Sequence, residues 1–167
     1  MIVNFVNILC IYRVNIMNNE LPSNTFDYPW LCENNYEIEY GDDVGKWMLF
    51  YDKSTMDENW ILAKNLYEKN KLVGVFSMKC STNYINPRAS STSSGIIIFY
   101  CNTSINEENI KIIGKNLLIQ MNYIEQKNIY YKTELQTKNG TCATGNKINS
   151  NYTLYNNLYK SVCLINL

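Results

Sequence analysis

The feature that most constrains the fold is a short apolar run at residues 45–51, Gly-Lys-Trp-Met-Leu-Phe-Tyr, with polar residues on both sides. Successive side chains of a strand point to opposite faces of a sheet. Both faces of this segment would be apolar, with Trp47, Leu49 and Tyr51 on one and Met48 and Phe50 on the other. We therefore expect a central strand that is covered on both sides.

The rest of the chain predicts two helices, three more strands and one or two edge strands. Ser54 or Thr55 caps the first helix, and a capping box of Ser104 and Glu107 opens the second, in which Gly114 lets the helix approach the sheet. The expected strands and loops are a strand at 73–80, a Ser/Thr/Asn-rich loop at 81–94, strands at 95–101 and 129–134, and one or two edge strands within 152–167.

The order strand, helix, strand, strand, helix, strand is a split β-α-β order. It places both helices on one face of a mostly antiparallel sheet and predicts an α+β fold, of which the ferredoxin-like arrangement is one form. A chain of 167 residues fits one domain. We assign residues 41–167 to a single α+β domain and residues 1–40 to an N-terminal extension with an aromatic lead-in.

The N-terminal extension shows no targeting or membrane signal. It lacks an uninterrupted apolar stretch of about 18 residues and a basic start with a cleavage site. Translation is expected to start at Met1 or at Met17, which opens a polar stretch. Pro22 and Pro29 exclude a long regular element. The lead-in is therefore expected to lie over the domain, with Trp30 either covering apolar sheet or stacking on a planar ligand.

Charge and histidine content restrict the function. Fifteen basic side chains balance fifteen acidic ones, so no overall basic field attracts a polyanion such as a DNA duplex. The chain has no histidine, which removes the commonest general base and metal ligand. The six cysteines include no C-x-x-C pair. We expect no metal or other cofactor, no membrane partner, and reduced thiols in a cytoplasmic monomer.

Four residues near strand ends form a candidate binding site. Right-handed crossovers would bring the carboxyl ends of the second and fourth strands to one edge of the sheet, with Lys79, Ser81 and Thr82 on one strand and Lys132 on the other. Three strand spacings would separate the two lysines by about 14 Å, which suits one phosphorylated ligand between them. The alternative is that both are solvated strand-end lysines.

Five segments form an ordered set within roughly residues 41–144. They are Gly45-Lys46-Trp47, Asp57 with Trp60, Lys79-Cys80-Ser81-Thr82, Ile97 to Cys101, and Tyr130-Tyr131-Lys132-Thr133-Glu134. In order and spacing they resemble the basophilic leukemia-expressed protein family, a domain of unknown function. That family has a fold like the mRNA cap-binding translation initiation factor 4E. The resemblance therefore implies a single curved, mostly antiparallel sheet with two helices on one face.

The same resemblance implies site residues. Cap-binding factors of this fold hold a methylated guanine between two tryptophan rings and its phosphates on basic side chains. Because Trp60 is expected in the core, the ring candidates here are Trp30 and Trp47. The phosphate contacts implied are Lys79, Lys132 and Arg88.

Three functions are consistent with these observations. The first is a non-enzymatic binding module for a nucleotide or RNA end. The second is a protein-interaction scaffold that binds a partner through the N-terminal aromatic segment and needs no small ligand. The third is a phosphoester-processing enzyme with Cys80 or Ser81 as nucleophile beside Lys79, whose charge would lower a thiol pKa.

Overall fold

The computed structural model describes residues 20–34, 44–85, 91, 93–102, 106–125, 127–139 and 150–155. Its strands form one antiparallel sheet in the order β1-β3-β4-β2-β5-β6. The strands are β1 Trp30–Asn34, β2 Val44–Asp52, β3 Ser77–Ser81, β4 Ser94–Asn102, β5 Ile129–Thr133 and β6 Tyr152–Leu154. The helices are α1 Met56–Glu68, α2 Glu107–Gln120 and α3 Glu134–Lys138, with short 3₁₀ turns η1 Pro22–Asn24 and η2 Lys53–Thr55. None of the described helices is long and apolar enough to cross a lipid bilayer.

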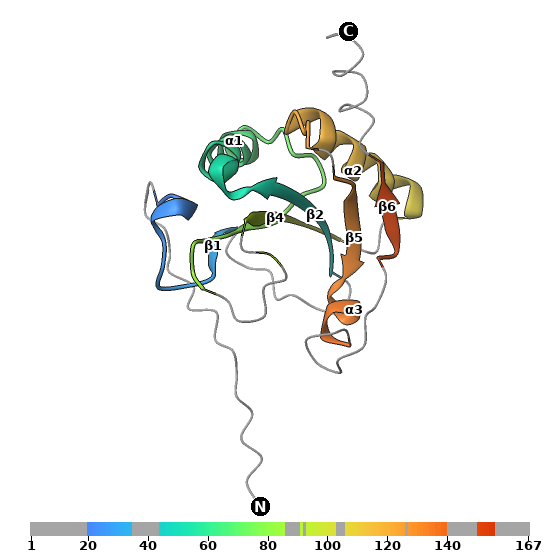
Figure 1. The fold of residues 1–167 in the computed structure, drawn as a ribbon. Helices are drawn as coiled ribbons and strands as arrows, with labels where there is room; N and C mark the ends of the chain where they lie inside the picture. Colours follow the sequence, from blue (N-terminus) through green and yellow to red (C-terminus); the bar gives the residue numbers. More distant parts are fainter. Residues whose placement is uncertain are drawn as a thin grey trace, which may run out of the picture.

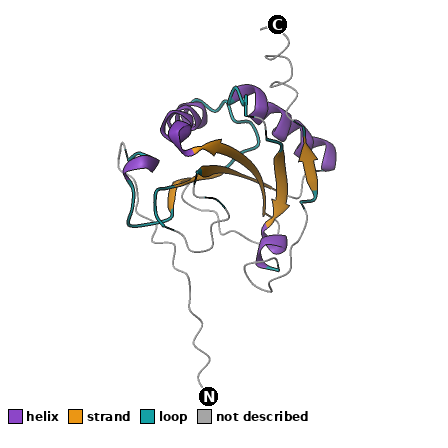
Figure 2. Cartoon of the chain, in the orientation of Figure 1, coloured by secondary structure: helices purple, strands orange, loops and turns teal. Residues whose placement is uncertain are grey.

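Strand β2 lies at the centre of the sheet, between β4 and β5, as expected for residues 45–51. The four central strands and two long helices keep the split β-α-β order, because α1 joins β2 to β3 and α2 joins β4 to β5. Figure 1 shows that the sheet is curved and that α1 and α2 lie over one side of it. The predicted α+β class, with a single curved antiparallel sheet, is therefore confirmed (Figure 2).

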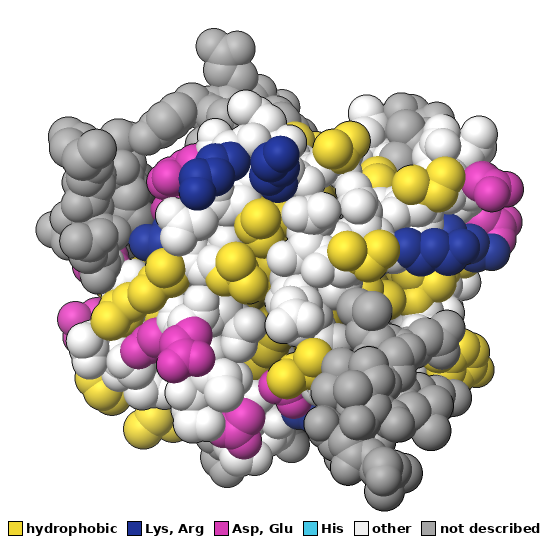
Figure 3. All heavy atoms as spheres, turned by 90° about the horizontal axis from the view of Figure 1, so that it is seen from above, with side chains coloured by type: hydrophobic (Ala, Val, Ile, Leu, Met, Phe, Trp, Pro, Cys, Tyr) yellow, Lys and Arg dark blue, Asp and Glu magenta, His cyan; other side chains and the backbone are white. Residues whose placement is uncertain are grey.

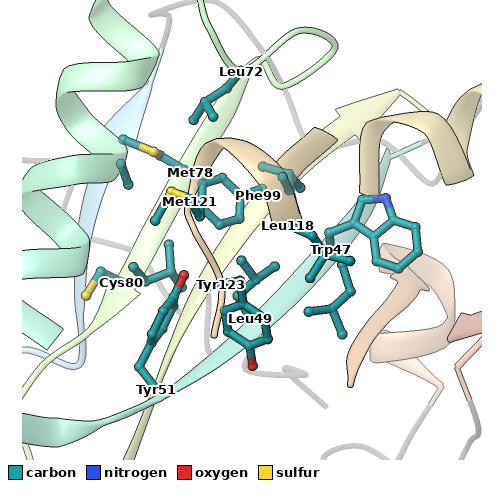
Figure 4. Close-up of a cluster of buried hydrophobic side chains, with 14 of the residues drawn as sticks. Trp47, Leu49, Tyr51, Leu72, Met78, Cys80, Phe99, Leu118, Met121 and Tyr123 are labelled. Atoms are coloured by element: carbon teal, nitrogen blue, oxygen red, sulfur yellow. The ribbon is translucent and has the colours of Figure 1, made fainter. Parts of the chain in front are cut away.

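One apolar core lies between the sheet and helices α1 and α2. Trp47, Leu49 and Tyr51 of β2 are at most 2% exposed, and Figure 4 shows them among side chains from neighbouring elements. Trp60 of α1 is 1% exposed, which confirms its expected place in the core. The Trp47 indole N–H donates a hydrogen bond to the Ile110 carbonyl of α2 at 3.1 Å. A polar contact thus joins strand and helix in addition to their packing.

Two element boundaries differ from the expectation. Residues 73–76, predicted as the start of a strand, include a turn at Gly74, whose φ of +84° favours glycine. Strand β3 therefore begins only at Ser77. The start of α2 is capped by Asn106, whose side chain accepts a hydrogen bond from the Asn109 amide at 2.9 Å. The expected cap, Ser104, lies outside the described residues.

The sequence pattern does not predict β1 or α3. Strand β1 follows the two prolines of the lead-in and pairs with β3 at the edge of the sheet, so the segment assigned to an N-terminal extension adds a strand to the domain. Helix α3 begins directly after β5, where Thr133 and Gln136 form a capping box. Both elements are short, and short elements leave little periodicity in a sequence.

Strands β3 and β5 run in opposite directions, contrary to the expectation that their carboxyl ends share one edge. Three antiparallel pairings separate them along the order β3-β4-β2-β5, and each pairing reverses the direction. The crossovers make β3 parallel to β2 and β5 parallel to β4, but β2 and β4 are themselves antiparallel. The predicted common edge for Lys79 and Lys132 is therefore wrong.

The close approach of α2 to the sheet is testable at Gly114. A Cβ atom there would lie 2.6 Å from the Trp47 ring and 2.6 Å from the Leu154 side chain. We predict that Gly114→Val lowers the free energy of unfolding by about 2–3 kcal/mol, because overpacking a filled core is destabilising. Urea unfolding measures the change.

The matched control is Lys115→Val on the same helix. Lys115 is exposed, so the expected cost is only the lower helix propensity of valine, about 0.5 kcal/mol. Equal stability of the two variants would contradict the close contact between α2 and the sheet.

Candidate functional site

The side of the sheet that faces away from α1 and α2, here called the front face, carries the lysines expected to bind a ligand. Because side chains alternate along each strand, the strand pairing decides which residues share this face. The front-face residues are Trp30 and Cys32 of β1, Ser77, Lys79 and Ser81 of β3, Ser94, Ile96, Ile98, Tyr100 and Asn102 of β4, Val44, Lys46, Met48, Phe50 and Asp52 of β2, Tyr130 and Lys132 of β5, and Thr153 of β6.

Lys79 lies beside two aromatic rings of the front face. Its Nζ atom is 4.6 Å from the Trp30 ring centroid and 5.4 Å from the Tyr100 ring centroid. Both residues are diagonal neighbours of Lys79 across the strand pairs, within reach of a long side chain. Such a cation–π contact contributes about 0.5–2 kcal/mol, more when it is desolvated. The ammonium group is thus held at a defined place on the face.

Lys46 carries a second ammonium group, in the middle of the front face. The residue is 5% exposed, and its Nζ atom lies 2.6 Å from Glu134 Oε1 and 5.8 Å from the centroid of the Tyr100 ring. A lysine this buried needs an acidic partner, because an unpaired buried charge costs on the order of several kcal/mol. Tyr100 is itself 3% exposed. The centre of the face is therefore filled, and these two side chains are almost fully covered, so a ligand would contact the half-buried residues around them, such as Lys79 and Lys132.

Lys132 lies directly opposite Lys46 in the pairing of β5 with β2. Like charges at directly opposite positions repel, and the Glu134 carboxylate beside Lys46 offsets this repulsion. Three strand spacings and two residues along the strand separate Lys79 from Lys132. On a flat sheet this separation corresponds to a distance of about 16 Å between their Cα atoms. The two lysines thus share a face, although not an edge.

The other residues expected at the site lie in different surroundings. Trp47 faces the helices and is 0% exposed, so it cannot contact a ligand on the front face, which corrects its expected role. Thr82 is 6% exposed, and its hydroxyl donates to a backbone carbonyl at 2.5 Å. The Ser81 hydroxyl accepts a hydrogen bond from the Ile96 amide at 2.9 Å. Arg88 lies outside the described residues.

Cys80, a nucleophile in the enzyme hypothesis, does not reach the front face. It points toward the helices and is 0% exposed, and burial raises the pKa of its thiol well above the usual value, with the Asp57 carboxylate as a second cause. Lys79 points to the other side of the sheet, because adjacent strand residues face opposite sides. The predicted activation of Cys80 by Lys79 is therefore wrong. Ser81 does share the front face with Lys79, but no histidine exists to act as its base.

Three further residues of this face, Lys46, Tyr100 and Glu134, are not among the expected site residues. One signal was present: Lys46 interrupts the apolar face that Met48 and Phe50 continue, and a lysine in a central strand requires an acid. Tyr100 gives no signal of its own among 14 tyrosines. Within the described residues, no three His, Cys, Asp or Glu side chains gather to hold a metal ion.

No protein-family model and no curated protein matches the chain. Solved structures do. They include eIF4E-3 from Ascaris suum with an m2,2,7G cap, at TM-score 0.52 and 12% identity over 73% of this chain and 63% of that one. The C. elegans eIF4E-3 with the 4E-binding protein Mextli and a cap analog matches at TM-score 0.50 and 9% identity, over 67% of this chain and 57% of that one. A schistosome eIF4E with m7GpppA and 4E-BP matches at TM-score 0.50 and 13% identity, over 69% and 61%.

The chain has an eIF4E-like fold. It spans about 63% of the length of the Ascaris suum protein. Because the sequence identities are low, the similarity concerns the fold alone. The implied resemblance in fold is therefore confirmed, and the site must be judged from its own side chains.

The Lys46–Glu134 pair gives the second prediction. Glu134→Ala should lower the free energy of unfolding by about 2–4 kcal/mol, because the Lys46 ammonium would stay buried without its carboxylate. Lys46→Met in the same variant should recover most of this loss, since no unpaired charge then remains. Urea unfolding of the single and double variants measures both effects.

The control is an exposed ion pair in the same chain. Glu107→Ala removes the partner of Lys111 on α2, where both side chains are more than 40% exposed. Its cost should stay below about 1 kcal/mol. Equal losses for Glu107→Ala and Glu134→Ala would contradict the burial of the Lys46–Glu134 pair.

Buried thiols give the third prediction. Cys80 and Cys101 are 0% exposed, and burial raises the pKa of the Cys101 thiol to about 12 and that of Cys80 well above its usual value. Neither forms appreciable thiolate at mildly alkaline pH, so a charged thiol reagent should modify both only in denaturant. Peptide mass spectrometry after brief labelling measures the modification. Labelling of Cys80 in the folded protein would restore it as a candidate nucleophile.

Proposed function

We propose that the protein is a non-enzymatic binding module that holds a 5′-phosphorylated nucleotide or RNA end across the front face. The observation that carries this proposal is the set of ammonium groups on that face. Lys79 and Lys132 lie on either side and Lys46 lies between them, with Glu134 as its carboxylate partner. Lysines bind phosphate as compact point charges. A phosphate chain laid over the face would lie near the ammonium groups of Lys79 and Lys132.

Trp30 supplies an apolar surface next to these charges. Its indole is half-buried in the edge strand β1, and Lys79 lies over its ring. Proteins that bind single-stranded nucleic acid stack bases on aromatic side chains, at about 1–3 kcal/mol per base. A base placed beside Trp30 would have its 5′ phosphates directed along the sheet toward Lys79 and Lys132.

The similar eIF4E structures support a nucleotide as the ligand class, since those proteins hold m2,2,7G, m7G and m7GpppA caps. The resemblance to the basophilic leukemia-expressed protein family remains part of the proposal and adds no ligand. The absence of histidine from the chain and the burial of Cys80 favour binding over phosphoester chemistry.

A protein partner is a second candidate, on the opposite side of the molecule. Ile61 of α1 and Ile112 and Ile119 of α2 are 43%, 51% and 61% exposed. Figure 3 shows apolar side chains among charged ones on this helix side. Several of the similar structures contain a 4E-binding protein. Single exposed apolar residues are common on protein surfaces, so the nucleotide has the stronger support.

The fourth prediction concerns nucleotide affinity. The protein should bind GTP, and the affinity should fall as KCl is raised from about 50 to 200 mM, because phosphate contacts are electrostatic. Lys79→Ala and Lys132→Ala should each weaken binding about tenfold, the equivalent of one charge-assisted hydrogen bond. Isothermal titration calorimetry measures these affinities.

Lys115→Ala serves as the control, because Lys115 is an exposed lysine of α2 on the other side of the sheet. It should leave GTP affinity unchanged. The proposal fails if no nucleotide or 5′-phosphorylated RNA binds, or if Lys115→Ala weakens binding as much as the front-face variants do.

A further inference from the structure

We propose that the front face selects the phosphate chain of its ligand and does not prefer a 7-methylated guanine to an unmethylated base. This inference rests on the proposed function and narrows its ligand class to nucleotides or RNA ends that are recognised by their 5′ phosphates and not by methylation of the base. It departs from the similar eIF4E structures, which hold methylated caps.

The first step concerns the tryptophans. The chain has three, and all of them lie in described segments. Trp47 and Trp60 are 0% and 1% exposed on the helix side of the sheet, and Trp47 is also hydrogen-bonded to α2. Only Trp30 belongs to the front face. A base on the front face therefore cannot stack between two indole rings.

The second step concerns the ring that remains. Methylation at N7 gives guanine a positive charge, and a cationic base gains from stacking because the aromatic face is negative. At Trp30 a cation already occupies this position: the Lys79 ammonium lies 4.6 Å from the ring centroid. A methylated base near Trp30 would compete with Lys79 for the ring and be repelled by its charge. An unmethylated base meets no such repulsion.

The third step concerns the phosphates. The same ammonium group that opposes a cationic base attracts an anion, and it is held in place by Tyr100 as well as by Trp30. Lys132 adds a second ammonium group on the face, whereas the charge of Lys46 beneath it is balanced by Glu134. Affinity should therefore depend on the phosphate chain and little on the charge of the base.

The test compares GTP, m7GTP, guanosine and inorganic tripolyphosphate by titration calorimetry on the full chain. GTP and m7GTP should bind within about threefold of each other, tripolyphosphate should compete with GTP, and guanosine should not bind measurably. RNA with a 5′-triphosphate, set against the same RNA with a 5′-hydroxyl, distinguishes an RNA end from a free nucleotide. A preference for m7GTP of more than about tenfold overturns this inference and leaves the proposed function standing. No binding by any phosphorylated ligand overturns both.

A variant pair tests the role assigned to Lys79. Lys79→Met removes the ammonium but keeps an unbranched side chain that packs on aromatic rings. It should weaken GTP more than m7GTP, so that the affinity ratio of m7GTP to GTP rises by at least about threefold. Lys79→Arg keeps the charge and should keep the wild-type ratio, and Lys115→Met should change neither affinity. An unchanged ratio in Lys79→Met, in a variant with the wild-type circular dichroism spectrum, overturns the inference.

Discussion

The pairing of β2 with β4 determines both faces of the sheet. It joins nine residue pairs, and a shift by one residue would move Trp47 to the front face and Lys46 into the core. Contacts with α2 oppose this shift, because the Trp47 indole donates a hydrogen bond to the Ile110 carbonyl and packs against Gly114. The lysines of the front face are therefore positioned by apolar burial on the other side of the sheet.

Lys46 links this architecture to the chemistry of the front face. Once the register is set, its ammonium must lie among apolar and aromatic side chains, and it needs a carboxylate within reach. Glu134 supplies one because α3 begins directly after β5, at the capping box of Thr133 and Gln136. The capping box that starts α3 thus positions Glu134 beside Lys46, which lies 88 residues earlier in the chain.

Much of the fold could be predicted from the sequence, because strong periodic signals decided it. The apolar run at 45–51 predicts the central strand, and Met56, Trp60, Ala63 and Tyr67, which recur at helical spacing, predict the first helix. The front face was only half predictable. Alternation along the expected strand at 129–134 puts Tyr130, Lys132 and Glu134 on one side. The relative direction of β3 and β5, however, depends on how β2 and β4 pair. That pairing joins segments about fifty residues apart and leaves no local trace in the sequence. Nor did any pattern show that Trp47, a candidate ring for stacking, would face the helices.

The positions of the tryptophans show why an eIF4E-like fold does not by itself determine the ligand. Trp47 and Trp60 fill the core at 0% and 1% exposure, where truncating so large a side chain costs about 3–5 kcal/mol. Neither can move to the front face without loss of stability on that scale. The chemistry of the face must then come from what alternation leaves there, which is an apolar and aromatic surface with ammonium groups set against Tyr100 and Trp30. Under the proposed function, a sheet built in this way would distinguish ligands by charge more than by the shape of a stacked ring.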